Sequence, residues 1–168
     1  MKNTIIYAVV LSLASIGCTE RKQEKTNNSN NEKKMEMKDK EAIERTIAVY
    51  FDALNSSSVQ NAVNQYTANG VFMPKEAPTS VGTEQLKGAY GHVFGTLGFI
   101  DMAHTIDELN VEGNFAIVRT SSLGNVKILA DDVIIEGATH RELFVMQKQN
   151  NEWKIARYMF NTVAAVSH

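Results

Sequence analysis

The sequence predicts an α+β fold, in which three helices come first and a strongly curved, mainly antiparallel sheet follows them. Apolar residues recur mostly at helical spacing from Ile43 to Leu97, and from Ile100 onward they alternate with a period of two. Helices and strands that are segregated along the chain in this way are typical of α+β proteins. A curved sheet wrapped over helices encloses a conical cavity, which is a usual site for a small ligand.

The first 17 residues are similar to a bacterial lipoprotein signal peptide. Lys2 precedes an apolar run, residues 4–17, that is shorter than the roughly 20 residues a membrane-spanning helix needs. Small residues precede Cys18, the only cysteine, as they do in a lipobox, although Ser15 stands where Leu is usual. We therefore expect lipid on Cys18, which would anchor the chain to a membrane of the bacterial cell envelope, facing the periplasm or the surface. The alternatives are an ordinary secretory signal or a buried thiol.

Composition divides the rest of the chain into two parts. Residues 18–38 are rich in Lys, Glu and Asn and are predicted to form a disordered tether, and the folded domain is expected in residues 39–168. The formal net charge is −2, and this lack of a basic excess argues against nucleic acid as a partner. With a single cysteine the chain has no internal disulfide, so an ordinary apolar core must stabilise it.

The predicted helices occupy the first half of the domain. The first is expected to begin at Asp39, a plausible N-cap, and to end near Asn55. Residues 56–58, all serine, then break the chain and cap a second helix over residues 59–66. A turn at residues 69–70, a short strand over residues 71–73 and a Pro-containing loop should follow. Thr83 is expected to cap a third helix that ends near Leu97.

The predicted strands are residues 100–108, 115–121 and 126–129 and a C-terminal hairpin over residues 141–161. Turns or bulges are expected at Gly113-Asn114 and Gly124-Asn125, and the hairpin turn at residues 149–152. Alternation along the hairpin separates Leu143, Val145 and Gln147 from Glu142, Phe144 and Met146. In the second hairpin strand it places Trp153, Ile155, Arg157, Met159 and Asn161 together, opposite Lys154, Ala156, Tyr158 and Phe160.

Several segments resemble the nuclear transport factor 2-like superfamily, and more closely its SnoaL-like, ketosteroid-isomerase-like branch of the SgcJ/EcaC type. They are YFDALNS (residues 50–56), YTANGVFMP (66–74), VGTE (81–84), RTSSLG (119–124), RELFV (141–145) and WKIARYMFN (153–161). The resemblance runs from about Lys40 to Asn161. It implies a cone-shaped barrel that commonly forms a homodimer, packed sheet to sheet. The fold hosts enzymes, binding domains and dimerisation modules alike.

The resemblance carries over only part of the isomerase site. Tyr50 stands where isomerases have their oxyanion-binding tyrosine, but residues 70–74, which should hold the carboxylate base, contain none. The second acid of the oxyanion hole has no clear match near Glu142. Ketosteroid isomerisation itself is therefore not expected.

Four residues are the catalytic candidates: Tyr50, His104, Glu142 and Arg157. Tyr50 either donates a hydrogen bond to a developing oxyanion or packs in the core. His104, in mid-strand, suits a general base because its reference pKa is about 6.5, but a strand histidine is more often structural. Glu142 is either an acid–base group or the partner of Arg119 or Arg157 in an ion pair across the sheet.

The ligand-binding lining is expected to include Phe72, Phe94, Met102, Arg119 and Met159. No metal-ligand spacing and no nucleotide-binding glycine pattern occurs, so we expect neither a metal nor a cofactor. Two functions remain open. The first is a cofactor-independent isomerase, cyclase or hydrolase that acts on a small, largely apolar molecule. The second is a non-catalytic ligand-binding or homodimerisation module.

Overall fold

A computed structural model describes residues 20–163 of the chain, with side chains from residue 32 onward. The predicted signal peptide, the predicted lipidation site at Cys18 and the terminal His168 lie outside the described residues. The chain divides into two compact units, residues 1–35 and 36–168. The described part of the first unit is helix, and the second unit contains the sheet and the apolar core.

The first helix, α1 (Glu20–Asn55), begins well before Asp39, where the sequence had predicted its start. The prediction of a disordered segment before Asp39 therefore differs from the structure. Residues 32–38 are exposed, and a helix that is polar all round can be supported by charge pairs one turn apart. Lys40 and Glu36 form such a pair at 2.7 Å. No helix among the described residues is long and apolar enough to cross a membrane.

The three helices bury the apolar stripe that the sequence predicts. Ile43, Ile47, Tyr50, Phe51 and Leu54 of α1 are buried, as helical spacing requires for one face. Ser58 caps α2 (Val59–Asn64), its Oγ accepting a hydrogen bond from the Asn61 amide. α3 (Gly82–Thr96) has Val81 at its N-cap position with no side-chain hydrogen bond, so the predicted Thr83 cap is wrong.

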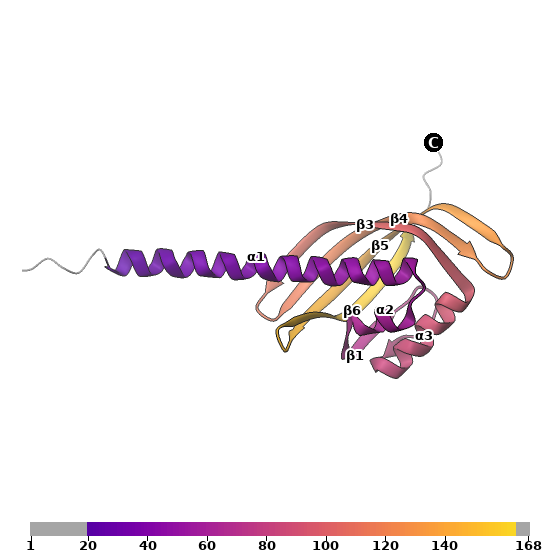
Figure 1. Ribbon diagram of the computed structural model, residues 1–168, viewed down its shortest axis with the longest axis horizontal. Coiled ribbons are helices and arrows are strands. Elements are labelled where there is room, and N and C mark those ends of the chain that lie inside the picture. Colours follow the sequence, from indigo (N-terminus) through magenta and orange to yellow (C-terminus); the bar gives the residue numbers. More distant parts are fainter. Residues whose placement is uncertain (1–19, 164–168) are drawn as a thin grey trace, which may run out of the picture. The chain divides into compact units, whose positions relative to one another are not determined.

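A six-stranded sheet follows the order β2-β1-β6-β5-β4-β3 (Figure 1). Its strands are β1 (Tyr66–Met73), β2 (Ser80–Val81), β3 (Leu97–Glu112), β4 (Phe115–Ile128), β5 (Val133–Gln149) and β6 (Glu152–Val163). Only β1 and β6 pair in parallel, and the other pairs are antiparallel. The described strands leave the sheet open between β2 and β3. The predicted α+β class, with a curved and mainly antiparallel sheet, is confirmed.

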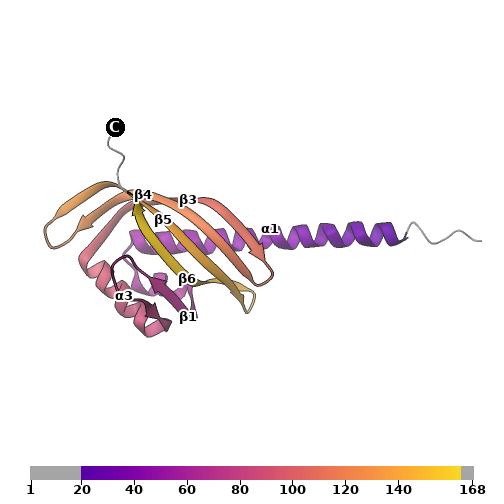
Figure 2. The ribbon, with the colours of Figure 1, turned by 180° about the vertical axis from the view of Figure 1, so that it is seen from behind.

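The helices of the second unit lie on one side of the curved sheet, and the other side is uncovered (Figures 1 and 2). Inward-facing strand residues, such as Val118, Phe144 and Ile155, are completely buried against those helices. Apolar residues on the outer side, such as Ile117 and Leu143, are exposed. The sheet therefore has a core-forming inner face and an open outer face that carries several exposed apolar residues.

The strands are longer than the sequence predicted. β4 runs through the predicted break at residues 124–125, where a register shift against β5 marks a bulge. β1 runs through Gly70, so the predicted turn there is wrong. A Cβ atom at Gly70 would lie 2.8 Å from the Tyr66 ring, so this close contact requires glycine. The predicted hairpin turn is confirmed, with Asn150 and Asn151 in left-handed conformations.

A bulge in β6 changes which of its residues face the core. Val145 pairs with Arg157 but Met146 pairs with Ile155, so Ala156 is an extra residue in β6. As a result Trp153 and Ile155 are buried on the same side as Tyr158, although the sequence predicted opposite faces. The single-face prediction for the second hairpin strand was therefore wrong. In β5, which has no bulge here, the predicted alternation is confirmed.

A second bulge lies in β3 at the end of α1. Asp101 has a φ of 51°, and the register against β4 shifts between Ile100 and Ala103. The Asn55 side chain occupies the gap, because its amide donates to the Met102 carbonyl at 3.1 Å and accepts from the Met102 amide at 2.8 Å. This contact fixes the helix terminus to the strand and holds Met102 in the core.

Candidate functional site

A cavity of about 280 Å³ lies between the helices and the inner face of the sheet. Its volume is near the lower end of small-molecule sites. Most of its wall is aromatic or aliphatic. The side chains come from α1, α3, the loop after β1 and the strands β1 and β3 to β6: Tyr50, Phe51, Leu54, Phe72, Pro74, Lys75, Ala77, Tyr90, His92, Val93, Thr96, Leu97, Phe99, Met102, Ser122, Val126, His140, Glu142, Tyr158 and Phe160. Such a wall favours a small ligand that is largely apolar.

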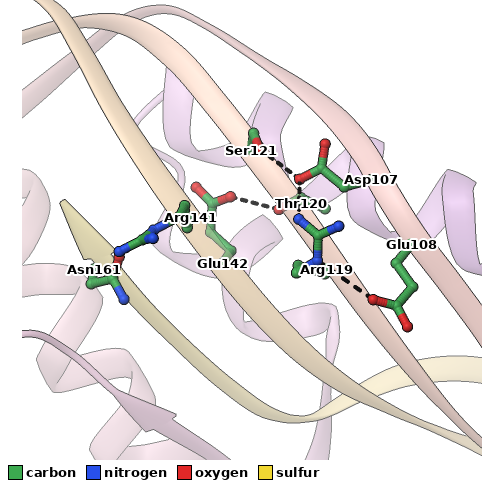
Figure 3. Close-up of polar contacts among 8 residues, drawn as sticks. All are labelled: Asp107, Glu108, Arg119, Thr120, Ser121, Arg141, Glu142 and Asn161. Carbon is green, nitrogen blue, oxygen red and sulfur yellow. Dashed lines mark hydrogen bonds and ion pairs between the residues drawn. The ribbon is translucent and has the colours of Figure 1, made fainter. Parts of the chain in front are cut away.

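The carboxyl group of Glu142 is the acidic side chain of this wall. Glu142 is only 3% exposed, and it accepts hydrogen bonds from Thr120 Oγ1 at 2.6 Å and Ser122 Oγ at 2.5 Å. Figure 3 shows the contact with Thr120. Burial raises the pKa of Glu142 above its ordinary value, and the two hydroxyl donors oppose this effect without cancelling it. The side chain is therefore an acid held in place from two directions.

Strand register explains why these polar groups meet. Thr120 pairs with Glu142 and Ser122 pairs with His140, so two positions of β4 lie directly opposite two positions of β5. In both strands the two residues are two apart, so their side chains point to the same face. All four side chains therefore gather on the inner face of the sheet.

His140 is the second titratable group that β5 brings to the cavity. It lines the wall, and its ring meets Phe160 edge to face at 5.7 Å between centroids. Burial lowers the pKa of His140 below its ordinary value, because an apolar surrounding disfavours the imidazolium ion. Its ring is therefore neutral at neutral pH and can accept a proton.

Three tyrosine hydroxyls form a buried chain beside the cavity. Tyr90 Oη lies 2.8 Å from Tyr50 Oη and 2.7 Å from Tyr66 Oη. Burial is the largest cause that raises the pKa of each of these tyrosines well above the ordinary value, so all three keep their protons. Tyr66 and Tyr158 are further hydrogen-bond partners of the Tyr50 hydroxyl. The structure therefore places Tyr50 in the core, with its hydroxyl bonded to other tyrosines.

His104, the other histidine candidate, does not line the cavity. Its ring stacks on Phe51 at 4.4 Å between centroids, and Phe51 itself lines the wall. His104 instead borders a shallow surface depression beside Glu44 and Ile106. The structure thus does not bring His104 together with Tyr50 and Glu142.

The arginine candidates also lie away from the cavity, on the outer face. Arg119 bonds Asp107 at 3.0 Å and Glu108 at 3.5 Å, and Figure 3 shows it between these two carboxylates. Arg157 is exposed and donates to the Ala156 carbonyl at 2.6 Å. The predicted ion pair of Glu142 with either arginine is therefore wrong, because strand alternation places them on opposite faces of the sheet.

The structure places two of the five predicted lining residues on the cavity wall. Phe72 and Met102 line the cavity, whereas Phe94 packs against Tyr90 and Phe99, which do. The remaining two, Arg119 and Met159, border a separate depression on the outer face, which Glu142 also borders.

Sequence reasoning missed several residues of the wall, among them Tyr90, Ser122, His140 and Tyr158. A usable signal was the pair of polar residues two apart in each of two neighbouring strands. Using it required the register between those strands, which the sequence does not state. Among the described residues, no group of three or more His, Cys, Asp and Glu side chains is placed to hold a metal ion.

The fold and cavity define this chain as a protein of the nuclear transport factor 2-like superfamily, and solved structures agree. A ketosteroid isomerase-like protein from Erwinia carotovora atroseptica is 32% identical over 74% of this chain and 95% of its own, with a TM-score of 0.69. A hexachlorocyclohexane dehydrochlorinase of LinA type 3 from Novosphingobium barchaimii covers 77% of this chain and 89% of its own at 11% identity, also with a TM-score of 0.69. An NTF2-like protein from Shewanella baltica is 12% identical over 77% of this chain and 97% of its own, with a TM-score of 0.59.

The chain belongs to the ketosteroid isomerase-like family of this superfamily, because the Erwinia protein is similar over nearly its whole length. The other two structures share the fold. No protein-family model matches the sequence, and no curated protein matches it.

Proposed function

We propose that this domain binds a small, largely apolar molecule in its cavity and acts on it as a cofactor-independent acid–base enzyme of the isomerase, cyclase or hydrolase type. The observation that carries the proposal is the buried carboxyl of Glu142, which borders an otherwise mainly apolar cavity. Carboxyl groups with a raised pKa in such surroundings are suited to donating a proton.

The residue composition of the cavity wall favours a ligand without charge. Its charged side chains are Glu142 and Lys75, and Lys75 is exposed in the loop after β1. No arginine lines the wall, so no side chain there offers the forked pair of donors that carboxylates and phosphates prefer. Aromatic rings such as Phe72, Tyr158 and Phe160 would instead cover the ligand's apolar surface.

The names of two similar proteins support the same class of ligand. The Erwinia protein is named as ketosteroid isomerase-like, and a hexachlorocyclohexane dehydrochlorinase shares the fold. Ketosteroids and hexachlorocyclohexane are both small and largely apolar. Because β1 carries Phe72 and Met73 where isomerases hold their carboxylate base, we propose a different arrangement of acid and base in this chain.

Native mass spectrometry of the chain, purified gently from its own host, tests the proposal. We expect a small uncharged molecule to co-purify, and we expect Glu142→Gln to retain the molecule but to lose its conversion. Arg157→Gln is the matched control, because Arg157 lies on the outer face. A protein that neither retains nor changes any component of a host extract would contradict an enzymatic cavity.

The second candidate is a non-catalytic binding module, and one observation favours it. Both carboxylate oxygens of Glu142 already accept hydrogen bonds from within the protein. A carboxyl group held in this way can orient a ligand without transferring a proton to it. The two functions differ in the Glu142→Gln variant, which would alter affinity alone in a binding module and would abolish turnover in an enzyme.

We also propose that the domain is carried on an envelope lipoprotein anchored through Cys18. The support is the apolar run that ends in small residues at the single cysteine. Replacing Cys18 by Ser should move the protein from the membrane fraction to the soluble fraction. Retention of that variant in the membrane fraction would contradict the lipid anchor.

A further inference from the structure

We infer that His140 is the second proton-transfer group of the cavity and acts as a base opposite the acid Glu142 on one bound carbonyl compound. This inference rests on the proposed function and deepens it. It supplies the base that β1 lacks, from a histidine that is not among the four catalytic candidates of the sequence.

The placement of the two side chains supports the pairing. His140 and Glu142 are two residues apart on β5 and both line the cavity. Because strand residues rise about 3.3 Å each, their Cα atoms are roughly 7 Å apart, which leaves room for a ligand to touch both. Ser122 stands opposite His140 and bonds Glu142, so it fixes the acid and leaves the histidine ring free.

The hydrogen bonds of the two groups differ in a way that suits different roles. Glu142 is oriented by two hydroxyl donors, as a positioned acid should be. The ring nitrogens of His140 make no hydrogen bond to any described residue, and its aromatic contact with Phe160 uses the ring alone. A polar ring on a cavity wall that has no partner within the described protein is suited to meeting a ligand.

The proton balance of the proposed step closes without a cofactor. A neutral ring nitrogen of His140 takes a proton from a carbon next to the ligand's carbonyl group, and the electron pair of that C–H bond forms a carbon–carbon double bond. At the same time the electrons of the C=O π bond move onto the carbonyl oxygen, which takes the proton of Glu142. The result is an enol, an imidazolium ion and a carboxylate. In a ligand that has a carbon–carbon double bond next to the deprotonated carbon, this enol is a dienol, and the imidazolium ion gives its proton to the far carbon of that double bond. The enol O–H proton returns to the Glu142 carboxylate as the carbonyl bond forms again, so the double bond moves by one position and both side chains regain their starting states.

Other titratable groups lie near this pair and must be considered in its pH dependence. Tyr50, Tyr90 and Tyr158 line the same cavity, together with Lys75 of the loop after β1 and His92 of α3. Asp107 of β3 adds to the raised pKa of Glu142. We expect the rate to rise with pH as His140 loses its proton and to fall as Glu142 loses its own.

Deuterium uptake from solvent tests the inference without a known ligand. The full chain in detergent is incubated in D₂O with a small-molecule extract of its own host, and carbon-bound deuterium is followed by mass spectrometry. We expect the wild type to label at least one compound, and His140→Gln and His140→Asn to reduce the labelling at least a hundredfold. His104→Gln, which removes the strand histidine outside the cavity, should label like the wild type. Thermal melting verifies that each variant is folded.

The outcomes separate the inference from the proposed function. If the wild type labels nothing, the inference is overturned, whereas the enzymatic function is still tested by the Glu142→Gln comparison, because a hydrolase need not place deuterium on carbon. If folded His140 variants label like the wild type, the inference is overturned while the enzymatic function stands. A positioning role for His140 would lower the rate without changing its pH profile, whereas a base role removes the acid limb of the profile.

Discussion

The hydroxyl of Ser122 lies 2.5 Å from Glu142 Oε1, and through this contact a residue of β4 holds the acid of β5. The donated hydrogen bond favours the charged carboxylate and therefore lowers the pKa that burial raises. The protonation state of Glu142 is thus set by burial, which raises its pKa, and by hydrogen bonds from hydroxyl groups, which lower it.

Replacing Ser122 by Ala should raise the pKa of Glu142 further, because one donor to its carboxylate is lost. A carbon-13 NMR titration of labelled glutamate side chains measures this change directly. Ser121→Ala is the matched control, since Ser121 donates to Asp107 on the outer face. An unchanged or lower Glu142 pKa in Ser122→Ala would show that the hydroxyl does not stabilise the carboxylate.

Asp39 joins α1 to the C-terminal hairpin. It accepts hydrogen bonds from Lys148 at 2.6 Å and Trp153 at 2.9 Å, and although burial opposes them, these contacts lower its pKa. Asp39→Asn should reduce the free energy of unfolding by about 1–3 kcal/mol at neutral pH, as expected for hydrogen bonds to a charged group. The exposed neighbour Glu41 is a suitable control, because its contact with Arg45 is long, at 3.9 Å.

The sign of the pH dependence at Asp39 follows from its lowered pKa. The folded state holds the carboxylate more strongly than the unfolded chain does, so the stabilisation is complete above the unfolded pKa and is lost as pH falls through the folded pKa. Urea unfolding at pH 7 and at about pH 2–3 should therefore show a difference between wild type and Asp39→Asn that shrinks in acid. A difference that stays constant with pH would contradict the charged interaction.

The two hydrogen bonds between Asn55 and the β3 bulge should contribute measurably to the free energy of unfolding. Asn55→Ala removes both hydrogen bonds to the Met102 backbone, and we expect a loss of about 1–3 kcal/mol. Asn64→Ala is the control, because its side chain bonds only the exposed Gln60. Chemical unfolding measures the loss in each variant. Equal free energies of unfolding for Asn55→Ala and Asn64→Ala would mean that water replaces the two Asn55 hydrogen bonds without cost.

The open outer face of the sheet leads us to propose a homodimer. Leu143 and Met159 are exposed there, as are Phe115, Ile117 and Leu123 of β4. Apolar faces of this kind are typical of protein–protein contacts. Light scattering of the unlipidated chain at micromolar concentration should give a dimer, and Leu143→Lys should give a monomer. Val49→Lys, on exposed α1, should remain dimeric, and a monomeric wild type would contradict the proposal.

Much of the architecture could be predicted from the sequence because its causes are local. The stripe of α1 is set by residues three and four apart, and the hairpin turn is set by Asn150 and Asn151, which tolerate left-handed backbone. The order of helices before strands then predicts the α+β class. Glu142 was also found, because an ionisable residue among apolar strand neighbours stands out in any sequence.

Which residues line the candidate site depends on contacts between distant segments, and the sequence does not state these contacts. The bulge at Ala156 changes the faces of β6, and a period-two pattern cannot show where one extra residue is inserted. The two strand histidines look alike in the sequence, yet α1 covers His104 through Phe51 while His140 borders the cavity.

The sequence by itself determined the order of helices before strands, the buried stripe of α1 and the C-terminal hairpin turn, because those preferences act between near neighbours. Only the tertiary structure decided that Ser122 and Thr120 hold Glu142, and that His140 rather than His104 shares its cavity. These relationships arise from strand register and helix packing, which depend on the fit of the whole chain.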